Sequence, residues 1–317
     1  MTCIRCQHQT CKKFGYFGKR RIQRWRCQSC KSTFCEPHDK LTRDTITSHP
    51  EVAAFALKCL VEGCSIRTTE RLTGLNRNTI MRLLLIASER SAQMMRHKLE
   101  NLTIQRIQCD ELHCFVQKRE RRVSIEESAE VGEQYTFLAM DPDSKLIFSW
   151  LTGKRTTANT ITFMRDVCAR TAWGWRPQVT TDGWGPYRLA VEASFKDSVD
   201  FAQLQKIYGA SLPPGRQGYA PARFVEAVSK VVKGHPDPRH ISTSYIERQN
   251  LTLRMMNRRF TRLTNAFSKK LTHLKAAITL HFAYYNFCRV HQSLKTTPAV
   301  SAGITDHVWT IGELLNA

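Results

Sequence analysis

Apolar and polar residues alternate along several stretches in the second half of the chain, with the period of two that predicts β-strands. Five runs have this pattern: residues 102–116, 135–140, 146–151, 176–182 and 199–207. Helical spacing of apolar residues separates some of them, over 157–173 and 187–195. The order of three strands, a helix, a strand, a helix and a strand predicts an α/β domain with a mixed sheet.

The stretch from residue 50 to 98 has helical spacing instead. Residues 62–65 interrupt it, and a second short helix ends at Gly74. A third helix is predicted over 79–88, and the amphipathic run 89–102 is interpreted as a connector to the following strand. These residues therefore predict a small helical module in front of the α/β domain.

The helices of this module have the order of a helix-turn-helix unit, with a glycine in the turn. Asn76 or Asn78 can cap the third helix, which would enter the major groove of DNA. Arg77, Asn78 and Arg82 would then face the DNA. The alternative is an ordinary helical bundle that links two domains.

Six of the 12 cysteines lie within the first 35 residues. Two Cys-x-x-Cys pairs, Cys3 with Cys6 and Cys27 with Cys30, are separated by 20 residues, and two such turns complete a tetrahedral zinc site. A segment this short cannot bury enough apolar area to fold alone, so one structural Zn²⁺ would supply the missing stability. The other two early cysteines, Cys11 and Cys35, have poorer spacing for the site.

Basic and aromatic residues alternate between the two cysteine pairs, which predicts a β-hairpin with a positive face. We therefore expect a zinc ribbon over residues 1–40, with Arg24 and Arg26 in contact with DNA. A purely structural module is the alternative, because zinc ribbons also serve protein contacts.

Lys and Arg number 48 against 27 Asp and Glu, a formal net charge of +21. A folded protein this basic usually binds a polyanion, and nucleic acid is the partner we expect. A membrane surface, a ribosome or merely a solvated basic face are the alternatives. No apolar run is long enough to span a bilayer and no signal peptide is present, so we expect a cytoplasmic location and no membrane partner.

Three acids are candidates for metal chemistry. Asp110 lies in the first predicted strand, Asp182 ends a strand beside Gly183, and Glu247 lies on a later helix. The order of elements is that of a ribonuclease H-like fold, in which the first and fourth strands are neighbours and a later helix closes the site. Three carboxylates suit two Mg²⁺ or Mn²⁺ ions. Each acid taken singly also fits a turn, a cap or a surface ion pair.

Glu111 adjoins Asp110, but successive strand residues point to opposite faces, so we rank Glu111 below Asp110 as a ligand. On the later helix, Glu247, Asn250 and Arg254 share a face, and Arg254 could reach a phosphate beside the metals.

This later helix is predicted to continue through Arg258 and Arg259, and every charged residue in 248–275 is basic, which indicates a phosphate track. Residues 208–240 before it are rich in Pro and Gly and predict an insertion, with a short helix over 222–232.

At these residues the chain resembles the transposases of the insertion-sequence-one family, a prokaryotic branch of the Asp-Asp-Glu transposases. The similar blocks are Cys109-Asp-Glu111, Thr181-Asp-Gly-Trp184, 246–254, 267–270 and the tail 285–298. The zinc ribbon, the helix-turn-helix module (41–101) and the ribonuclease H-like domain (102–317) stand where that family carries them.

The resemblance implies that Asp110, Asp182 and Glu247 are the metal-binding triad. It also implies cleavage of double-stranded DNA at terminal inverted repeats, strand transfer into target DNA, a homodimer or larger assembly, and association with the nucleoid. Two alternatives are a DNA-binding regulator whose catalytic domain has decayed, and a structure-selective nuclease of the same fold.

Overall fold

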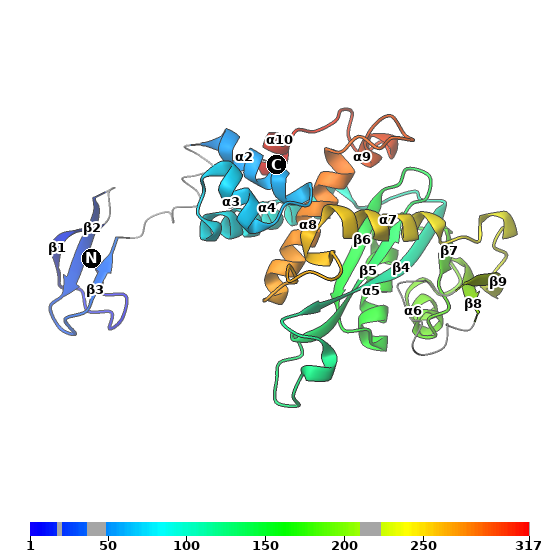
Figure 1. Ribbon diagram of the computed structural model, residues 1–317, viewed down its shortest axis with the longest axis horizontal. Coiled ribbons are helices and arrows are strands. Elements are labelled where there is room, and N and C mark those ends of the chain that lie inside the picture. The colour runs from blue at the N-terminus through cyan, green and yellow to red at the C-terminus, as the bar shows by residue number, and fades with distance from the viewer. Residues whose placement is uncertain (18–20, 37–48, 210–222, 317) are drawn as a thin grey trace. The chain divides into compact units, whose positions relative to one another are not determined.

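The computed structural model describes residues 1–17, 21–36, 49–209 and 223–316. It divides the chain into two compact units, Met1–Val52 and Ala53–Ala317 (Figure 1). The predicted boundary between residues 40 and 41 lies outside the described residues. The predicted boundary at residue 101 falls within the second unit, where the helices of 53–98 share one body with the sheet.

The first unit is a small antiparallel sheet of β1 (Cys11–Phe17), β2 (Ile22–Cys27) and β3 (Thr33–Cys35). Among the described residues of this unit, Cys3, Cys27 and Phe34 form the buried core, with Cys11 and Trp25 packed against them. The Trp25 indole N–H donates to the Glu36 carboxylate at 3.1 Å. A core of this size stabilises a fold only weakly.

Three helices precede the large sheet: α2 (Pro50–Val61), α3 (Ile66–Thr73) and α4 (Arg77–Lys98). The Ser65 side chain caps α3, and Gly74 ends it with φ +69°. Asn76 caps α4 by accepting a hydrogen bond from the Asn78 amide at 2.9 Å. Of the two candidate caps, Asn76 therefore has this role, and Asn78 is already helical.

The predicted third helix and its connector form one continuous helix of 22 residues. No Gly or Pro interrupts α4, and its buried side continues through Ser91, Met94 and Met95. This side packs against the carboxyl-terminal helices α8 (Leu271–Phe287) and α10 (Ile311–Asn316).

The large sheet has six strands in the order β6-β5-β4-β7-β8-β9. Their bounds are β4 Arg106–Val116, β5 Gly132–Met140, β6 Ile147–Gly153, β7 Gln178–Thr181, β8 Asp200–Tyr208 and β9 Phe224–Lys233. β4, β7 and β8 are parallel to one another, whereas β5, β6 and β9 each pair antiparallel with their neighbours. The five predicted strands are confirmed, and β4 lies beside β7 as the predicted order requires.

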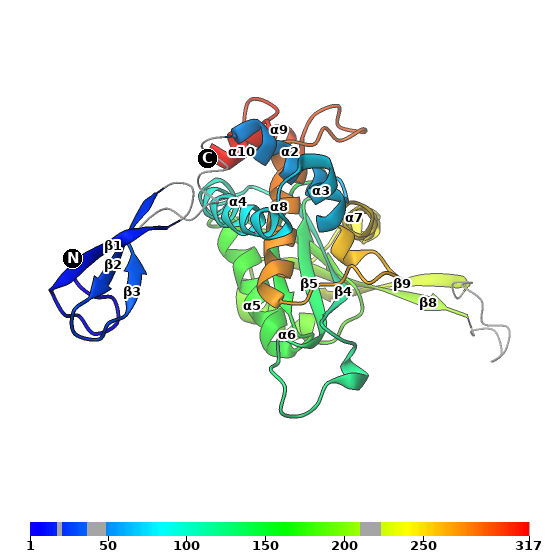
Figure 2. The same cartoon turned by 60° about the vertical axis from the view of Figure 1, so that its left-hand side comes forward.

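Helices cover both faces of this sheet (Figures 1 and 2). Alternation along β5 divides its side chains between them. Phe137 contacts Phe163 of α5 (Thr157–Arg170), with ring centroids 5.7 Å apart. Leu138 points the other way, into the core formed with α8 and α7 (Ser244–Met256). α6 (Pro186–Phe195) packs on α5.

The remaining elements are short: α9 Pro298–Ser301 and the 3-10 turns η1 Glu120–Arg122, η2 Pro238–His240 and η3 Arg258–Phe260. The aromatic run 280–287, predicted to be core, is buried in α8. None of the helices in the described parts of the chain is long and apolar enough to cross a membrane.

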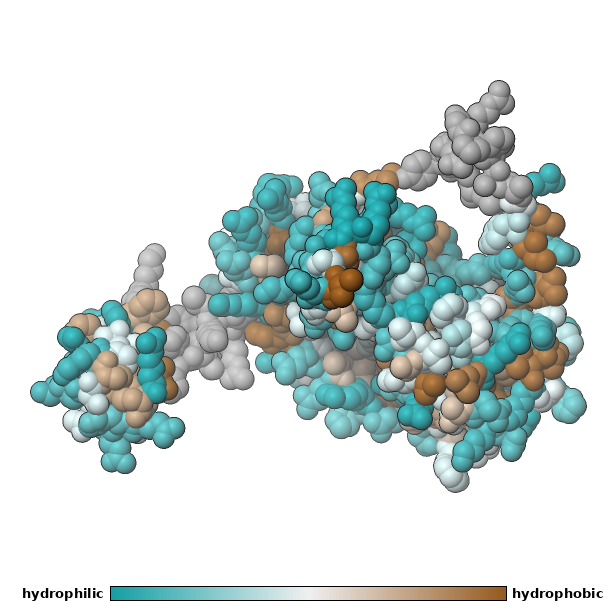
Figure 3. Space-filling model, turned by 90° about the horizontal axis from the view of Figure 1, so that it is seen from below, coloured by the Kyte–Doolittle hydropathy of each residue, from teal (hydrophilic) through white to brown (hydrophobic). Residues whose placement is uncertain are grey.

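The predicted short helix over 222–232 was wrong. Residue 222 lies outside the described residues, and 224–233 is the strand β9, antiparallel to β8. Four of its ten residues are valines, which favour a strand, and β8 offers a free edge for pairing. Figure 2 shows the two strands continuing as a ribbon beyond the rest of this unit, and exposed apolar side chains gather along it (Figure 3).

The helix predicted to run through Arg258 and Arg259 ends at Met256. Asn257 leaves the helix, and its side-chain amide donates to the Ala277 carbonyl of α8 at 3.2 Å. Arg258 and Arg259 therefore lie in the turn η3 and do not continue the helical face of Arg254.

Candidate active site and cysteine cluster

The acids Asp110 and Glu111 lie on β4 at the point where its neighbour β7 stops. Cys109 is the last residue of β4 that pairs with β7, opposite Thr181, and β4 continues to Val116. Asp182 follows Thr181 directly into the gap that this leaves. The carboxylates of Asp110, Glu111 and Asp182 offer oxygen atoms that all lie within 4.8 Å of one another.

The structure brings Glu111 into this group, although the sequence ranked it below Asp110. Its side chain is 2% exposed and lies 3.3 Å from Nε of Arg155. Strict alternation would place it on the other face of the sheet. Beyond residue 109, however, β4 has no β7 residue beside it. Side chains from both faces of β4 can therefore reach the same gap.

Arg155 is a site residue that sequence reasoning missed. It lies between β6 and α5, and its guanidinium contacts Glu111 and, at 3.6 Å, Asp182. The same group lies 3.9 Å from the centroid of the Trp184 ring, a cation–π contact that fixes its plane. A tryptophan two residues after a candidate acid is a weak signal for such a partner, and nothing in the local sequence singles out Arg155.

Glu247 lines a cavity of about 730 Å³ together with Asp110, Glu111, Asn250 and Arg254. It does not belong to the group of three carboxylates within 4.8 Å. Its carboxylate instead accepts hydrogen bonds from Lys206 Nζ and from the Thr243 hydroxyl, each at 2.6 Å. The structure thus joins two of the three predicted acids directly and places the third on the wall of the same cavity.

Asn250 connects α7 to the acids. Its Nδ2 donates to Oδ2 of Asp110 at 2.7 Å. Its Oδ1 is buried and has no hydrogen-bond partner among the described residues. A buried oxygen without a donor is costly unless something else binds it, and a cation is one such partner.

Burial and mutual repulsion change the acidity of the group. Burial is the main reason that the pKa of Asp110 is raised to about 7. The Glu111 amide lowers this pKa, whereas the negative charges of Asp182 and Glu247 raise it. Burial, followed by the charge of Asp182, raises the pKa of Glu111 to about 8.

The pKa of Asp182 is also raised by burial, although the Trp184 amide opposes this. A divalent cation relieves such repulsion, and an all-oxygen donor set suits Mg²⁺ or Mn²⁺. The residues present therefore fit a divalent metal.

The four cysteines of the first unit form a second cluster. Sγ atoms of Cys3, Cys6, Cys27 and Cys30 all lie within 4.8 Å of one another. Two pairs of Sγ atoms, Cys3 with Cys30 and Cys6 with Cys27, are 3.6 Å apart. A tetrahedral site with metal–sulfur bonds of about 2.3 Å has sulfur atoms roughly 3.8 Å apart, so these residues fit such a metal. Cys11 and Cys35 do not belong to the cluster.

Backbone amides favour the thiolate at Cys3, whereas at Cys6, against the His8 amide, the Cys30 thiol and burial raise the pKa to about 12. The Cys6 amide and then the Arg5 amide, 3.4 Å from Cys3 Sγ, lower the pKa of Cys3 to about 6, although burial opposes them.

The predicted DNA-contacting residues are distributed over both units. In the first, the guanidinium groups of Arg24 and Arg26 lie 5.7 and 5.3 Å from the Phe14 ring centroid, on one side of the small sheet. In the second, Arg77, Asn78 and Arg82 are exposed at the start of α4, and Arg258 is exposed in η3.

No protein-family model and no curated protein matches this chain. Among solved structures, the piggyBac transposase in a synaptic complex with hairpin DNA is 9% identical, with 92% of this chain and 72% of that chain covered and a TM-score of 0.37.

The Mos1 strand transfer complex (10% identity, 52% and 60% covered, TM-score 0.21) and a pre-cleavage Mos1 transpososome (8%, 55% and 63%, 0.19) are also similar. The chain spans less than two thirds of either Mos1 chain. TM-scores below 0.5 do not establish a common fold.

Proposed function

We propose that this protein is a DNA transposase that cuts DNA strands at the ends of an insertion sequence and joins the freed 3′-hydroxyl to target DNA. The observation that carries the proposal is the meeting of Asp110, Glu111 and Asp182 in one gap of the sheet, where Asp110 and Glu111 also line a cavity with Glu247 and Asn250. Buried like charges of this kind are costly without cations, so their meeting points to a function.

Asp110, Asp182 and Glu247 would hold two Mg²⁺ or Mn²⁺ ions, with Asn250 Oδ1 and Glu111 as further oxygen donors. When bound, such ions activate a water or a 3′-hydroxyl and stabilise the leaving oxygen of a phosphodiester. Arg155 would hold Glu111 and Asp182 in position through its two contacts. Arg254, on the wall of the same cavity, would bind a phosphate of the strand.

The other modules would recognise DNA. Cys3, Cys6, Cys27 and Cys30 would bind one structural Zn²⁺, and Arg24 and Arg26 of this zinc ribbon would contact DNA. Helices α2 to α4 would act as the helix-turn-helix module, with Arg77, Asn78 and Arg82 of α4 on the terminal inverted repeats. Arg258 would contact the phosphate backbone.

The proposal extends to the setting of the reaction. We place the chain in the insertion-sequence-one family and in the prokaryotic cytoplasm at the nucleoid. Two element ends must be joined, so a homodimer or larger assembly is expected. Asp110 and Asp182 belong to one group of carboxylates, and Glu247 lines a cavity together with Asp110, which favours a transposase over a decayed regulator.

The experiment uses DNA that carries the inverted repeats flanking the coding frame. Purified protein with Mn²⁺ should cleave at the repeats and join their 3′ ends to a plasmid, and Asp182→Ala should abolish both steps while leaving DNA binding intact. Glu100→Gln, which removes an exposed acid that belongs neither to the carboxylate group nor to the lining of its cavity, is the matched control and should stay active. Strand transfer by the Asp182→Ala protein would overturn the site, and cleavage without joining would indicate the nuclease.

A further inference from the structure

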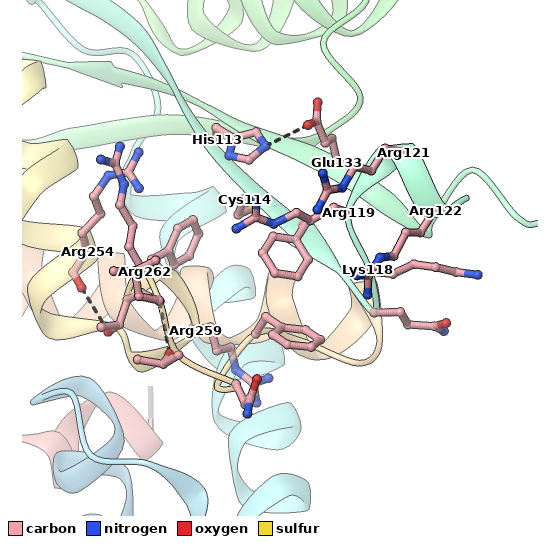
Figure 4. Close-up of a pocket in the computed structure, with 18 residues that line it drawn as sticks. His113, Cys114, Lys118, Arg119, Arg121, Arg122, Glu133, Arg254, Arg259 and Arg262 are labelled. Carbon is pink, nitrogen blue, oxygen red and sulfur yellow. Dashed lines mark hydrogen bonds and ion pairs between the residues drawn. The ribbon is translucent and has the colours of Figure 1, made fainter. Parts of the chain in front are cut away.

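A second cavity, of about 890 Å³, opens beside the one that contains the acids. One wall is the loop after β4, which carries the turn η1, and the other is the segment 259–267 after α7 (Figure 4). Arg254, Thr261 and Arg262 line both cavities. The two are therefore adjacent compartments, and we refer to the second one as the arginine cleft.

The charge of the arginine cleft is almost entirely positive. Seven of its lining residues are Lys or Arg, and its one acid, Glu133, lies 3.5 Å from His113. Lys118 is paired with Glu127 at 2.6 Å. Five other cations make no ion pair with any residue that the structure describes: Arg119, Arg121, Arg122, Arg254 and Arg262.

Like charges held together in this way repel one another. Burial, and then the charge of Arg262, lowers the pKa of Arg254, and burial lowers the pKa of Arg259. Arg259 is fixed by a hydrogen bond to the Ser268 hydroxyl at 3.0 Å. An exposed side chain without a partner can rotate away from its neighbours, but a partly buried and hydrogen-bonded one such as Arg259 cannot. An anion in the cleft would relieve this repulsion.

We infer that the arginine cleft binds the sugar-phosphate backbone of a nucleic-acid strand that continues from the acidic gap. This inference deepens the proposed function and rests on it, because the strand in the cleft would be the one whose phosphodiester lies at the acids. Arg119, Arg121 and Arg122 would then be binding residues distant from the reacting atoms, and Arg254 and Arg262 would bridge the two compartments.

The chemistry of the cleft favours a phosphate chain over an acidic peptide. Arginine presents a planar fork of donors that matches phosphate oxygens, and here the unpaired cations in the cleft are all arginines. They come from two separate segments and extend away from the acids, which suits a chain of regularly spaced anions more than one ion. Phe115 and Phe267, with ring centroids 4.7 Å apart, form an apolar stretch of the wall that a sugar or base could contact.

The test measures binding of the full chain, without divalent metal, to a fluorescein-labelled single-stranded oligonucleotide over a range of salt concentrations. The variant Arg119→Ala, Arg121→Ala, Arg122→Ala removes three exposed loop cations and should fold normally. The control variant Arg96→Ala, Arg165→Ala, Lys196→Ala removes three exposed cations outside the cleft, so its net charge is equal.

Each phosphate contact contributes about 0.7 to the slope of log K against log salt for single strands, so the cleft variant should lose about 2 units of slope. The control should lose much less. Lysine at the same three loop positions should restore most of the slope, because the charge is kept. Equal slopes for the cleft variant and the control would overturn the inference. Equally tight binding of polyglutamate, with the same loss in the cleft variant, would also overturn it and indicate a general polyanion site.

This readout does not depend on catalysis. If the wild-type protein cleaves and joins DNA but the cleft variant has the same salt-dependence slope as the control variant, the cleft assignment fails and the proposed function stands. If the cleft variant loses its slope but no DNA is ever cleaved, the proposed function fails and a nucleic-acid-binding cleft remains.

Discussion

Asp110→Asn should stabilise the metal-free protein, because it removes a buried charge that folding disfavours. Burial raises the pKa of Asp110 from 3.8 to about 7. A shift of about three pKa units corresponds to roughly 4 kcal/mol against the ionised form at pH 8. Asparagine avoids this, and Asn250 can turn so that its free Oδ1 accepts from the new amide. Imperfect hydrogen bonds of the new amide would cost about half of these 4 kcal/mol. The free energy of unfolding should therefore rise by about 2 kcal/mol.

The sign of the pH dependence follows from the direction of the shift. A carboxyl whose pKa is higher in the folded protein destabilises the fold above its unfolded pKa. The penalty grows as pH rises from 3.8 and is complete above about 7. Between pH 8 and pH 5 the advantage of the asparagine variant should therefore fall by roughly 2.5 kcal/mol, so that it disappears at pH 5.

The assay is thermal unfolding of the full chain with chelator and with Mn²⁺, at pH 8 and pH 5. A gain of about 2 kcal/mol corresponds to a rise in Tm of roughly 4–8 °C for a unit of this size. Mn²⁺ should stabilise wild type at pH 8 and have little effect on Asp110→Asn. Glu100→Gln should behave as wild type throughout. A lower Tm for Asp110→Asn at pH 8 without metal would show that burial of this charge does not destabilise the fold. Undiminished stabilisation by Mn²⁺ would show that Asp110 is not a metal ligand.

Three further predictions concern other contacts. Arg155→Met should raise the pKa values of Glu111 and Asp182 further and lower Mn²⁺-dependent strand cleavage at pH 7 by roughly 10- to 100-fold, with partial recovery at pH 9; an unchanged rate would show that Arg155 has no part in the site. Cys27→Ser should abolish the zinc-dependent fold of the first unit, measured as loss of one bound Zn²⁺ and of the Trp25 fluorescence transition, whereas Cys35→Ser should retain both; loss of zinc in the second variant would contradict the assigned ligand set. Lys206→Met should free the Glu247 carboxylate and tighten Mn²⁺ binding several-fold in calorimetry, and weaker binding would instead show that Lys206 supports the site.

The period of apolar residues and the order of the predicted strands and helices predicted the sheet well, because alternation of buried and exposed side chains is a local property. Its neighbour relation, β4 beside β7, followed from the order of elements. The strand β9 was missed, since Phe224–Lys233 has no buried face and depends on pairing with β8. The end of α7 was missed as well, because Asn257 leaves the helix to bond Ala277, a residue on another helix.

The candidate site was predictable only in part. The acids at 110 and 182 could be paired because they lie at equivalent points of two strands expected to be neighbours. Glu111, Arg155 and Lys206 could not be assigned, since their places depend on where β7 stops and on contacts between distant segments. The cysteine cluster was the easiest part to predict, because two Cys-x-x-Cys turns bring four thiols close enough together to bind one metal ion.

If the carboxylates around the end of β7 share divalent cations, electron paramagnetic resonance should detect them when Mn²⁺ is added to the zinc-loaded full chain. Wild type should show bound, magnetically coupled Mn²⁺ ions that are lost in both Asp182→Ala and Glu247→Ala and retained in Glu100→Gln. Wild-type protein that binds no more Mn²⁺ than the two alanine variants would contradict this prediction.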